Sequence, residues 1–106
     1  MLAIGVDIEN LNNFPDYNTG DERRFFQDNY TKNEIDYCLK NHNPQLSFMS
    51  LFSVKESIIK ADNSYMGKKL NNIEIKFDDM GKPFFGDFSI SISHCGNICV
   101  TVAVIS

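Results

Sequence analysis

The sequence lacks an excess of basic residues. Ten lysines and arginines stand against 14 aspartates and glutamates, which gives a formal net charge of −4 and a pI near 5.0. A protein that binds nucleic acid or an anionic membrane non-specifically needs a basic surface to collect phosphates. We therefore expect neither nucleic acid nor a membrane among its partners.

A basic leader and a membrane-spanning run are also missing. The first ten residues, MLAIGVDIEN, contain two carboxylates and no lysine or arginine, unlike a signal peptide or a membrane span. Cys38, Cys95 and Cys99 are an odd number of cysteines in a chain without an export signal, which fits reduced thiols better than a disulfide framework. We expect a cytoplasmic protein.

The chain does contain enough apolar residues for a small core. With 106 residues, 42% hydrophobic and 12% aromatic, it is long enough for one domain and too short for two independent ones. No repeat, low-complexity tract or linker interrupts it. We expect a single domain over residues 1–106.

Hydrophobic periodicity predicts a strand, then helices, then further strands. Leu2, Ile4, Val6 and Ile8 alternate with Ala3, Gly5, Asp7 and Glu9, which predicts a strand with its apolar set buried and both carboxylates on the opposite face. We expect a loop at 10–20, helices over 21–29, 31–40 and 44–63, a loop at 63–69, and strands at 73–78, 84–85, 88–93 and 100–104. This order of elements indicates an α+β fold.

Two helix starts carry local signals. Thr31 followed by Glu34 has the pattern of a capping box, in which each residue binds the other's backbone N–H. Pro44 suits the first turn of a helix, because its fixed φ is helical and its missing N–H would have no partner there. It opens the longest predicted helix.

That longest helix carries charge close to its apolar face. In LFSVKESIIKAD at 51–62, Lys55 falls inside the apolar arc, and Phe52, Glu56 and Lys60 follow one another at four-residue spacing. Taken alone, this is ordinary helix decoration. A Glu–Lys pair one turn apart contributes about 0.3–0.5 kcal/mol, and a lysine can lay its methylenes on the core with its head in solvent.

Carboxylates at the junction of the first strand and this helix are candidate metal ligands. Mg²⁺ commonly takes one or two carboxylates together with substrate phosphates and water. Asp7 and Glu56 are the candidates, and Glu9 could join them from the same strand face. Lys60 would then lie beside any phosphate that such a metal bridges.

Two turns carry weaker signals. His94 with Cys95 and Cys99 could suggest a metal site, but no second ligand cluster supports it, and residues at a hairpin turn are the better interpretation. The backbone at Gly81, in DDMGKP, could approach a ligand closely or simply form a hairpin turn.

Together these motifs resemble the holo-[acyl-carrier-protein] synthases, the short-chain branch of the 4′-phosphopantetheinyl transferase superfamily. The resemblance rests on IGVDIE at 4–9, YTKNEIDYC at 30–38, FSVKESIIKA at 52–61, GKP at 81–83 and SISH at 91–94. It implies that superfamily's fold, an antiparallel sheet packed against a long central helix and shorter helices. It also implies transfer of 4′-phosphopantetheine from coenzyme A to a serine of an acyl or peptidyl carrier protein.

The resemblance further implies roles for particular residues. Asp7 and Glu56 would hold Mg²⁺ on the coenzyme A pyrophosphate, Glu56 would help to remove the serine proton, and Lys60 would stabilise the phosphates. Further contacts to coenzyme A map onto Phe52, Lys55, Gly81, Lys82, Pro83, Ser93 and His94. Relatives of this length imply a homotrimer, with the metal ligands from one chain and the GKP and SISH segments from its neighbour.

The chain departs from the family's pattern in places. Leu51 stands where the family usually has arginine, and residues 62–64 replace a Gly-Thr-Gly segment; Arg23 and Arg24 are the only basic residues between positions 10 and 24. One alternative is a non-catalytic paralogue that binds a carrier protein or a nucleotide. Another is a small α+β interaction domain with solvated charges, for which no metal-dependent coenzyme A binding is expected.

Overall fold

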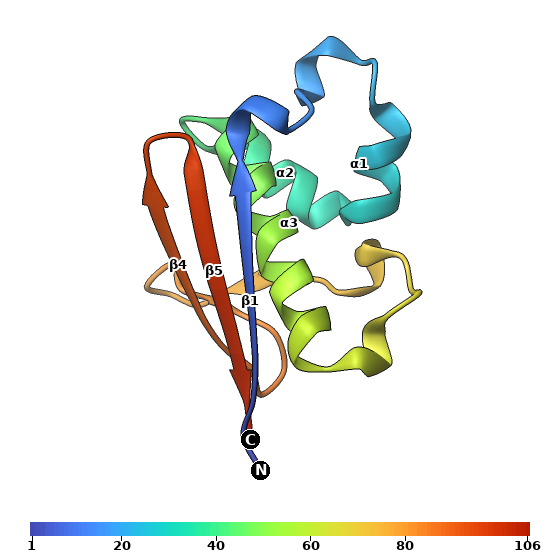
Figure 1. Cartoon of the computed structure of the whole chain (residues 1–106). Coiled ribbons are helices and arrows are strands. Elements are labelled where there is room, and N and C mark those ends of the chain that lie inside the picture. The colour runs from blue at the N-terminus through green and yellow to red at the C-terminus, as the bar shows by residue number, and fades with distance from the viewer.

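A three-stranded antiparallel sheet packed against one long helix forms the centre of the computed structural model, which describes all 106 residues (Figure 1). The elements are β1 (Ala3–Asn10), α1 (Arg23–Asn29), α2 (Lys32–Lys40), α3 (Pro44–Ala61), β2 (Lys76–Phe77), β3 (Pro83–Phe84), β4 (Ser89–Cys95) and β5 (Ile98–Ile105). The sheet has the order β1-β5-β4, and β2 and β3 form a separate pair. The helices lie on one side of the sheet, which confirms the α+β class.

The two local helix signals are confirmed. At the start of α2, the Thr31 side chain accepts from the Glu34 N–H at 3.2 Å, and Glu34 Oε1 accepts from the Thr31 N–H at 2.9 Å. Pro44 lies in the first turn of α3, where the Asn43 side chain caps the helix by accepting from the Leu46 N–H at 3.2 Å. Helix α1 begins at Arg23, two residues after the predicted start, and has no side-chain cap.

The predicted hairpin is confirmed, whereas the predicted strand at 73–78 is wrong in extent. β4 and β5 pair around a tight turn at Gly96, with His94 opposite Cys99. Only Lys76–Phe77 of the predicted strand is in a ladder. The N–H of Ile75 donates instead to Glu34 Oε2 at 2.8 Å, so this buried stretch is held by a side chain rather than by a neighbouring strand.

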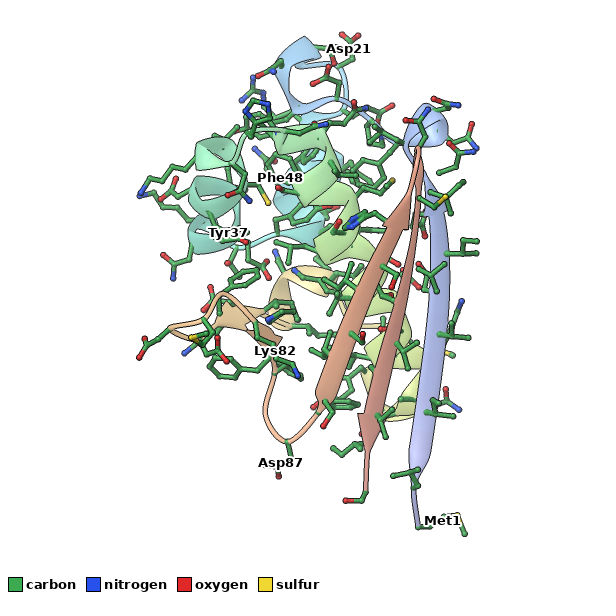
Figure 2. All side chains as sticks on the ribbon, turned by 90° about the vertical axis from the view of Figure 1, so that its left-hand side faces the viewer. Met1, Asp21, Tyr37, Phe48, Lys82 and Asp87 are labelled. Atoms are coloured by element: carbon green, nitrogen blue, oxygen red, sulfur yellow. The ribbon has the colours of Figure 1, made fainter.

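The buried face of β1 is the opposite of the predicted one. Gly5 and Asp7 are buried against α3, while Ile4 and Val6 are 65% and 54% exposed. Leu2 and Ile8 are exposed as well, and the half-buried valines of β5 at 100, 102 and 104 extend this face. This apolar outer face, residues 2, 4, 6, 8, 100, 102 and 104, is not covered by any helix (Figures 1 and 2).

Close packing between β1 and α3 explains the reversal. An ideal Cβ built on Gly5 would lie 1.9 Å from the Ser57 carbonyl oxygen and 2.6 Å from the Ala61 nitrogen. Only glycine allows the strand and the helix backbones to approach this closely. The branched side chains at positions 4 and 6 could not occupy that inner face, so they face outward.

Candidate functional site

Asp7 lies where β1 crosses α3, and its carboxylate is held from both sides. Oδ1 is 3.0 Å from Nζ of Lys60, and Oδ2 accepts a hydrogen bond from Ser53 Oγ at 2.9 Å. Ser53 Oγ in turn lies 2.8 Å from Thr101 Oγ1 on β5. The Asp7 side chain is 9% exposed and that of Lys60 53%, so the carboxylate is fixed within the fold and the ammonium reaches solvent.

Two further carboxylates, those of Glu56 and Glu9, lie close enough to Asp7 for its charge to raise their pKa values. The pKa of Glu56 is raised, first by burial and then by the negative charge of Asp7. The pKa of Glu9 is raised to about 7, first by burial, then by a hydrogen bond with Asp7 and by the charges of Asp7 and Glu56. Lys60 opposes both shifts. The predicted grouping of Asp7, Glu56 and Lys60 therefore exists in the fold.

This grouping fits a hard divalent cation whose coordination sphere is completed by oxygens of a ligand and by water. No set of three His, Cys, Asp or Glu side chains is arranged to hold a metal ion by itself. Mg²⁺, however, usually takes only one or two protein carboxylates and fills its remaining positions with phosphate oxygens and water. Asp7 and Glu56 offer such oxygens. Burial is the main cause of the raised pKa of Glu56, and the charge of Asp7, which is the second cause, is one that a cation would offset.

A cavity of about 510 Å³ lies beside Glu56, between α3, α1 and the segment 66–70. It is lined by Phe25, Asp28, Asn29, Phe52, Glu56, Ile59, Met66, Gly67, Lys68, Lys69 and Leu70. Phe52 and Glu56, one helical turn apart, therefore face the same space, as their spacing predicts. Lys68 and Lys69 contribute positive charge at this cavity.

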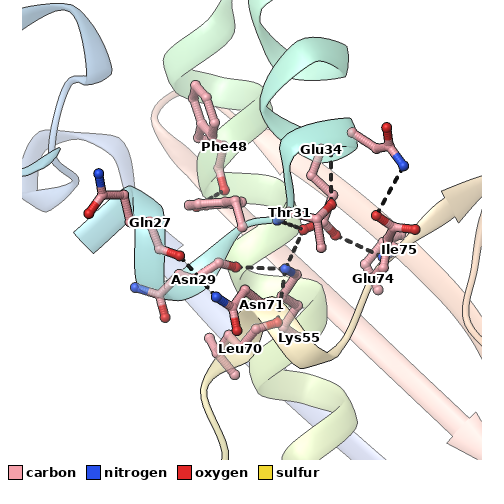
Figure 3. A network of polar contacts seen from close by, with 12 residues as sticks. Gln27, Asn29, Thr31, Glu34, Phe48, Lys55, Leu70, Asn71, Glu74 and Ile75 are labelled. Atoms are coloured by element: carbon pink, nitrogen blue, oxygen red, sulfur yellow. Dashed lines mark hydrogen bonds and ion pairs between the residues drawn. The ribbon is translucent and has the colours of Figure 1, made fainter. Parts of the chain in front are cut away.

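Lys55, next to Glu56 in sequence, faces the interior instead (Figure 3). Its ammonium is fully buried and donates to Glu34 Oε1 at 2.6 Å, to the Asn29 carbonyl at 2.6 Å and to the Leu70 carbonyl at 3.1 Å. Burial lowers its pKa, and the Glu34 carboxylate opposes that shift. The expectation that its head extends into solvent is wrong, because these three acceptors replace water. Its contact with coenzyme A stays a prediction.

A second cavity, of about 220 Å³, lies between α2, α3, the 81–83 turn and β4. It is lined by Tyr37, Leu46, Ser47, Ser50, Leu51, Phe77, Gly81, Pro83, Ile92 and His94. Gly81 has φ +83°, a backbone conformation that would be strained for a residue with a side chain. Its N–H donates to the Asp78 carbonyl at 2.9 Å. The structure thus brings three of the predicted contact residues, Gly81, Pro83 and His94, to one space.

The remaining two predicted contact residues lie outside this cavity. Lys82 is exposed on the turn, and its backbone N–H donates to Asp78 Oδ1 at 2.8 Å. Ser93 is exposed on the sheet face opposite to that of His94, because neighbouring residues of a strand point to opposite faces.

The two groups of predicted residues thus occupy separate cavities of one chain. Phe52 and Glu56 line the larger one, and the adjacent Leu51 lines the smaller one with His94. No cavity contains residues of both groups.

Sequence reasoning missed the serines of α3. Ser50 and Ser53 are buried, and each meets a predicted site residue, His94 and Asp7 respectively. Serines at three-residue spacing on the buried side of an otherwise apolar helix were a usable signal, because a buried hydroxyl needs a partner.

A family model, a protein sequence and a solved structure similar to this chain all come from phosphopantetheinyl transferases. The sequence pattern of the 4′-phosphopantetheinyl transferase superfamily matches residues 3–103. A holo-[acyl-carrier-protein] synthase of Pediococcus pentosaceus is 37% identical over 115 residues, covering 99% of this chain and 96% of that protein. A holo-(acyl-carrier-protein) synthase structure from Bacillus anthracis, in complex with CoA (3′,5′-ADP), superposes with a TM-score of 0.74 at 27% identity, covering 96% of this chain and 93% of that one.

A much longer relative matches as well. The fatty acid synthase subunit alpha of Candida albicans is 37% identical over 84 residues, which cover 76% of this chain but only 4% of that subunit. The chain therefore corresponds to a small part of that protein. None of the helices described here combines the length and apolar composition required to cross a membrane.

Proposed function

The chain belongs to the 4′-phosphopantetheinyl transferase superfamily, and we propose that it converts an apo carrier protein to its holo form. Its relatives include holo-[acyl-carrier-protein] synthases that match it over nearly the whole chain. The resemblance drawn from the five motifs is thereby confirmed, and so is the fold that it implied. The donor would be coenzyme A, and the acceptor a serine of an acyl or peptidyl carrier protein.

The observation that carries this proposal is the grouping of Asp7, Lys60 and Glu56 at the crossing of β1 and α3. In the transfer, the serine oxygen would bond to the phosphorus next to pantetheine. The bond from that phosphorus to the bridging oxygen of the pyrophosphate breaks, and adenosine 3′,5′-bisphosphate leaves. Lys60, which is held by Asp7 and reaches solvent, is suited to stabilise the charge that develops on the leaving phosphate.

Glu56 would accept the serine proton, directly or through a water. Its half-buried carboxylate lies within the electrostatic reach of Asp7 and Lys60, so a proton acceptor is available in this grouping. It lines the larger cavity, through which an acceptor could approach. Asp7 and Glu56 would hold Mg²⁺, which when bound neutralises the pyrophosphate oxygens. The chain would otherwise contribute by holding the serine hydroxyl and the pyrophosphate in position to react.

We also propose that the complete site forms between copies of the chain. Within one chain, the residues of the larger cavity and those of the 81–83 turn and β4 do not share a space. The apolar outer face leaves Ile4 at 65% and Val6 at 54% exposure, which a second copy would bury. A symmetric homotrimer, as the resemblance implies, would join one copy's Glu56 to its neighbour's His94.

The test is to mix the purified protein with coenzyme A, Mg²⁺ and a panel of apo carrier proteins, and to measure intact mass. The proposal expects a carrier that gains one phosphopantetheine, and expects EDTA to abolish the gain. Glu56→Gln should abolish transfer while the circular dichroism spectrum is kept. Coenzyme A binding without mass gain on any carrier would favour the non-catalytic paralogue, and absence of both would favour an interaction domain.

A further inference from the structure

Ser50 is a buried hydroxyl on α3 that the proposed transfer step does not use. It is 9% exposed and lines the same cavity as His94. Its Oγ lies 2.9 Å from the Leu46 carbonyl oxygen and 2.8 Å from Nε2 of His94. The second contact joins α3 to β4 across 44 residues of sequence. It is the only hydrogen bond that the His94 side chain makes within the chain.

The single proton of the hydroxyl decides the direction of both contacts. A carbonyl oxygen only accepts, so the contact with Leu46 uses the Ser50 proton. Because this proton lies in the bond to Leu46, Ser50 Oγ can only accept a hydrogen bond from the His94 ring. Nε2 of His94 must therefore carry a hydrogen and donate it. If the hydroxyl donated to a bare Nε2 instead, the bond to Leu46 would be lost and one hydrogen bond would replace two. The arrangement with two bonds is therefore favoured.

We propose that Ser50 is a positioning residue for His94: it binds Nε2–H, fixes the ring, and leaves Nδ1 as the nitrogen that faces the donor nucleotide. This rests on the proposed function, in which His94 contacts coenzyme A. Both contacts of the Ser50 hydroxyl are with groups of the chain, the Leu46 carbonyl and the His94 ring, so the role assigned to it involves no contact of its own with the donor. Its effect passes entirely through the orientation and protonation pattern of the imidazole.

The first test needs no substrate. The whole chain, labelled with ¹⁵N, is studied by two-bond ¹H–¹⁵N correlation at a pH where the imidazoles are neutral. The only other histidine is His42, so His94→Ala assigns the signals. We expect the Nε2–H tautomer at His94 with a ring proton protected from exchange, and loss of that protection in Ser50→Ala. An Nδ1–H tautomer in the unmodified protein would overturn the proposal, whether or not the protein proves to be a transferase.

The second test uses kinetics. Ser50→Ala should raise the KM for coenzyme A by about three- to tenfold with little change in kcat, the range expected for loss of one ordinary hydrogen bond. In a His94→Ala background the same change should add nothing, because Ser50 acts only through the ring. An unchanged KM, or a full effect that persists without the imidazole, would contradict the assignment.

Two controls separate this role from a structural one. Ser57 also donates to a carbonyl of its own helix, that of Val54 at 2.7 Å, but does not meet a histidine. Ser57→Ala should therefore leave the His94 tautomer and proton exchange unchanged. Ser50→Thr and Ser50→Val introduce side chains of the same shape, of which only threonine has a hydroxyl. Comparing these two variants keeps the test usable even if Ser50→Ala folds poorly. Equal KM values in this pair would rule the hydroxyl out.

Discussion

The buried Lys55–Glu34 pair offers the sharpest test of how this fold is held together. Lys55 is fully buried and Glu34 has 1% of its side chain exposed. Lys55→Met leaves the Glu34 carboxylate without its cation and removes one donor each from the carbonyls of Asn29 and Leu70, of which the Leu70 carbonyl keeps the Ile73 N–H. Removing one partner of such a pair typically costs about 3–5 kcal/mol. For a domain with about 5–15 kcal/mol of stability in total, this is a large fraction.

The reciprocal change and the double variant show whether the two charges are coupled. Glu34→Gln should destabilise similarly, because it leaves a buried ammonium. The double variant Lys55→Met with Glu34→Gln has no unpaired charge inside. Its loss should therefore be smaller than the sum of the single losses, by about 0.5–3 kcal/mol for contacting residues.

The assay is urea unfolding followed by circular dichroism, at one fixed protein concentration because association adds to apparent stability. Lys32→Met is the matched control, since Lys32 forms a 3.9 Å pair with Asp36 on the surface of α2 and is 91% exposed. It should change the free energy of unfolding by no more than about 0.5 kcal/mol. A loss below about 1 kcal/mol for Lys55→Met, or strict additivity in the double variant, would refute the reasoning.

Three further predictions concern β1. Gly5→Ala should destabilise the chain by about 1–3 kcal/mol or more in the same assay, because the new methyl overlaps the Ser57 carbonyl; wild-type stability would show that β1 and α3 can separate at little cost. Without metal, stability should fall as pH rises from 4.5 to about 7, because over that window the folded chain keeps a proton on Glu9 that the unfolded chain releases. Glu9→Gln should flatten that slope, and an unchanged slope would assign it to another group. Val6→Lys should shift the mass measured by light scattering to that of one chain, whereas an unaltered oligomer would place the interface elsewhere.

Local features of the chain could be predicted because their partners lie within a few residues. The capping box of Thr31 and Glu34 and the proline start at Pro44 depend only on groups within one turn, and both form as predicted. The β4–β5 hairpin likewise depends on alternation and a glycine turn. The grouping of Asp7 with Glu56 and Lys60 followed from helix spacing together with the family resemblance.

Tertiary packing decided what periodicity left open. Alternation in β1 defines two faces but does not say which one meets a helix; the close approach at Gly5 turned Asp7 inward and the branched residues outward. The position of Lys55 on α3 was evident, yet its burial depends on Glu34 and two carbonyls that are distant in sequence. Those partners become neighbours only when the whole chain folds, because a hydrogen bond inside the core requires groups from several elements to meet.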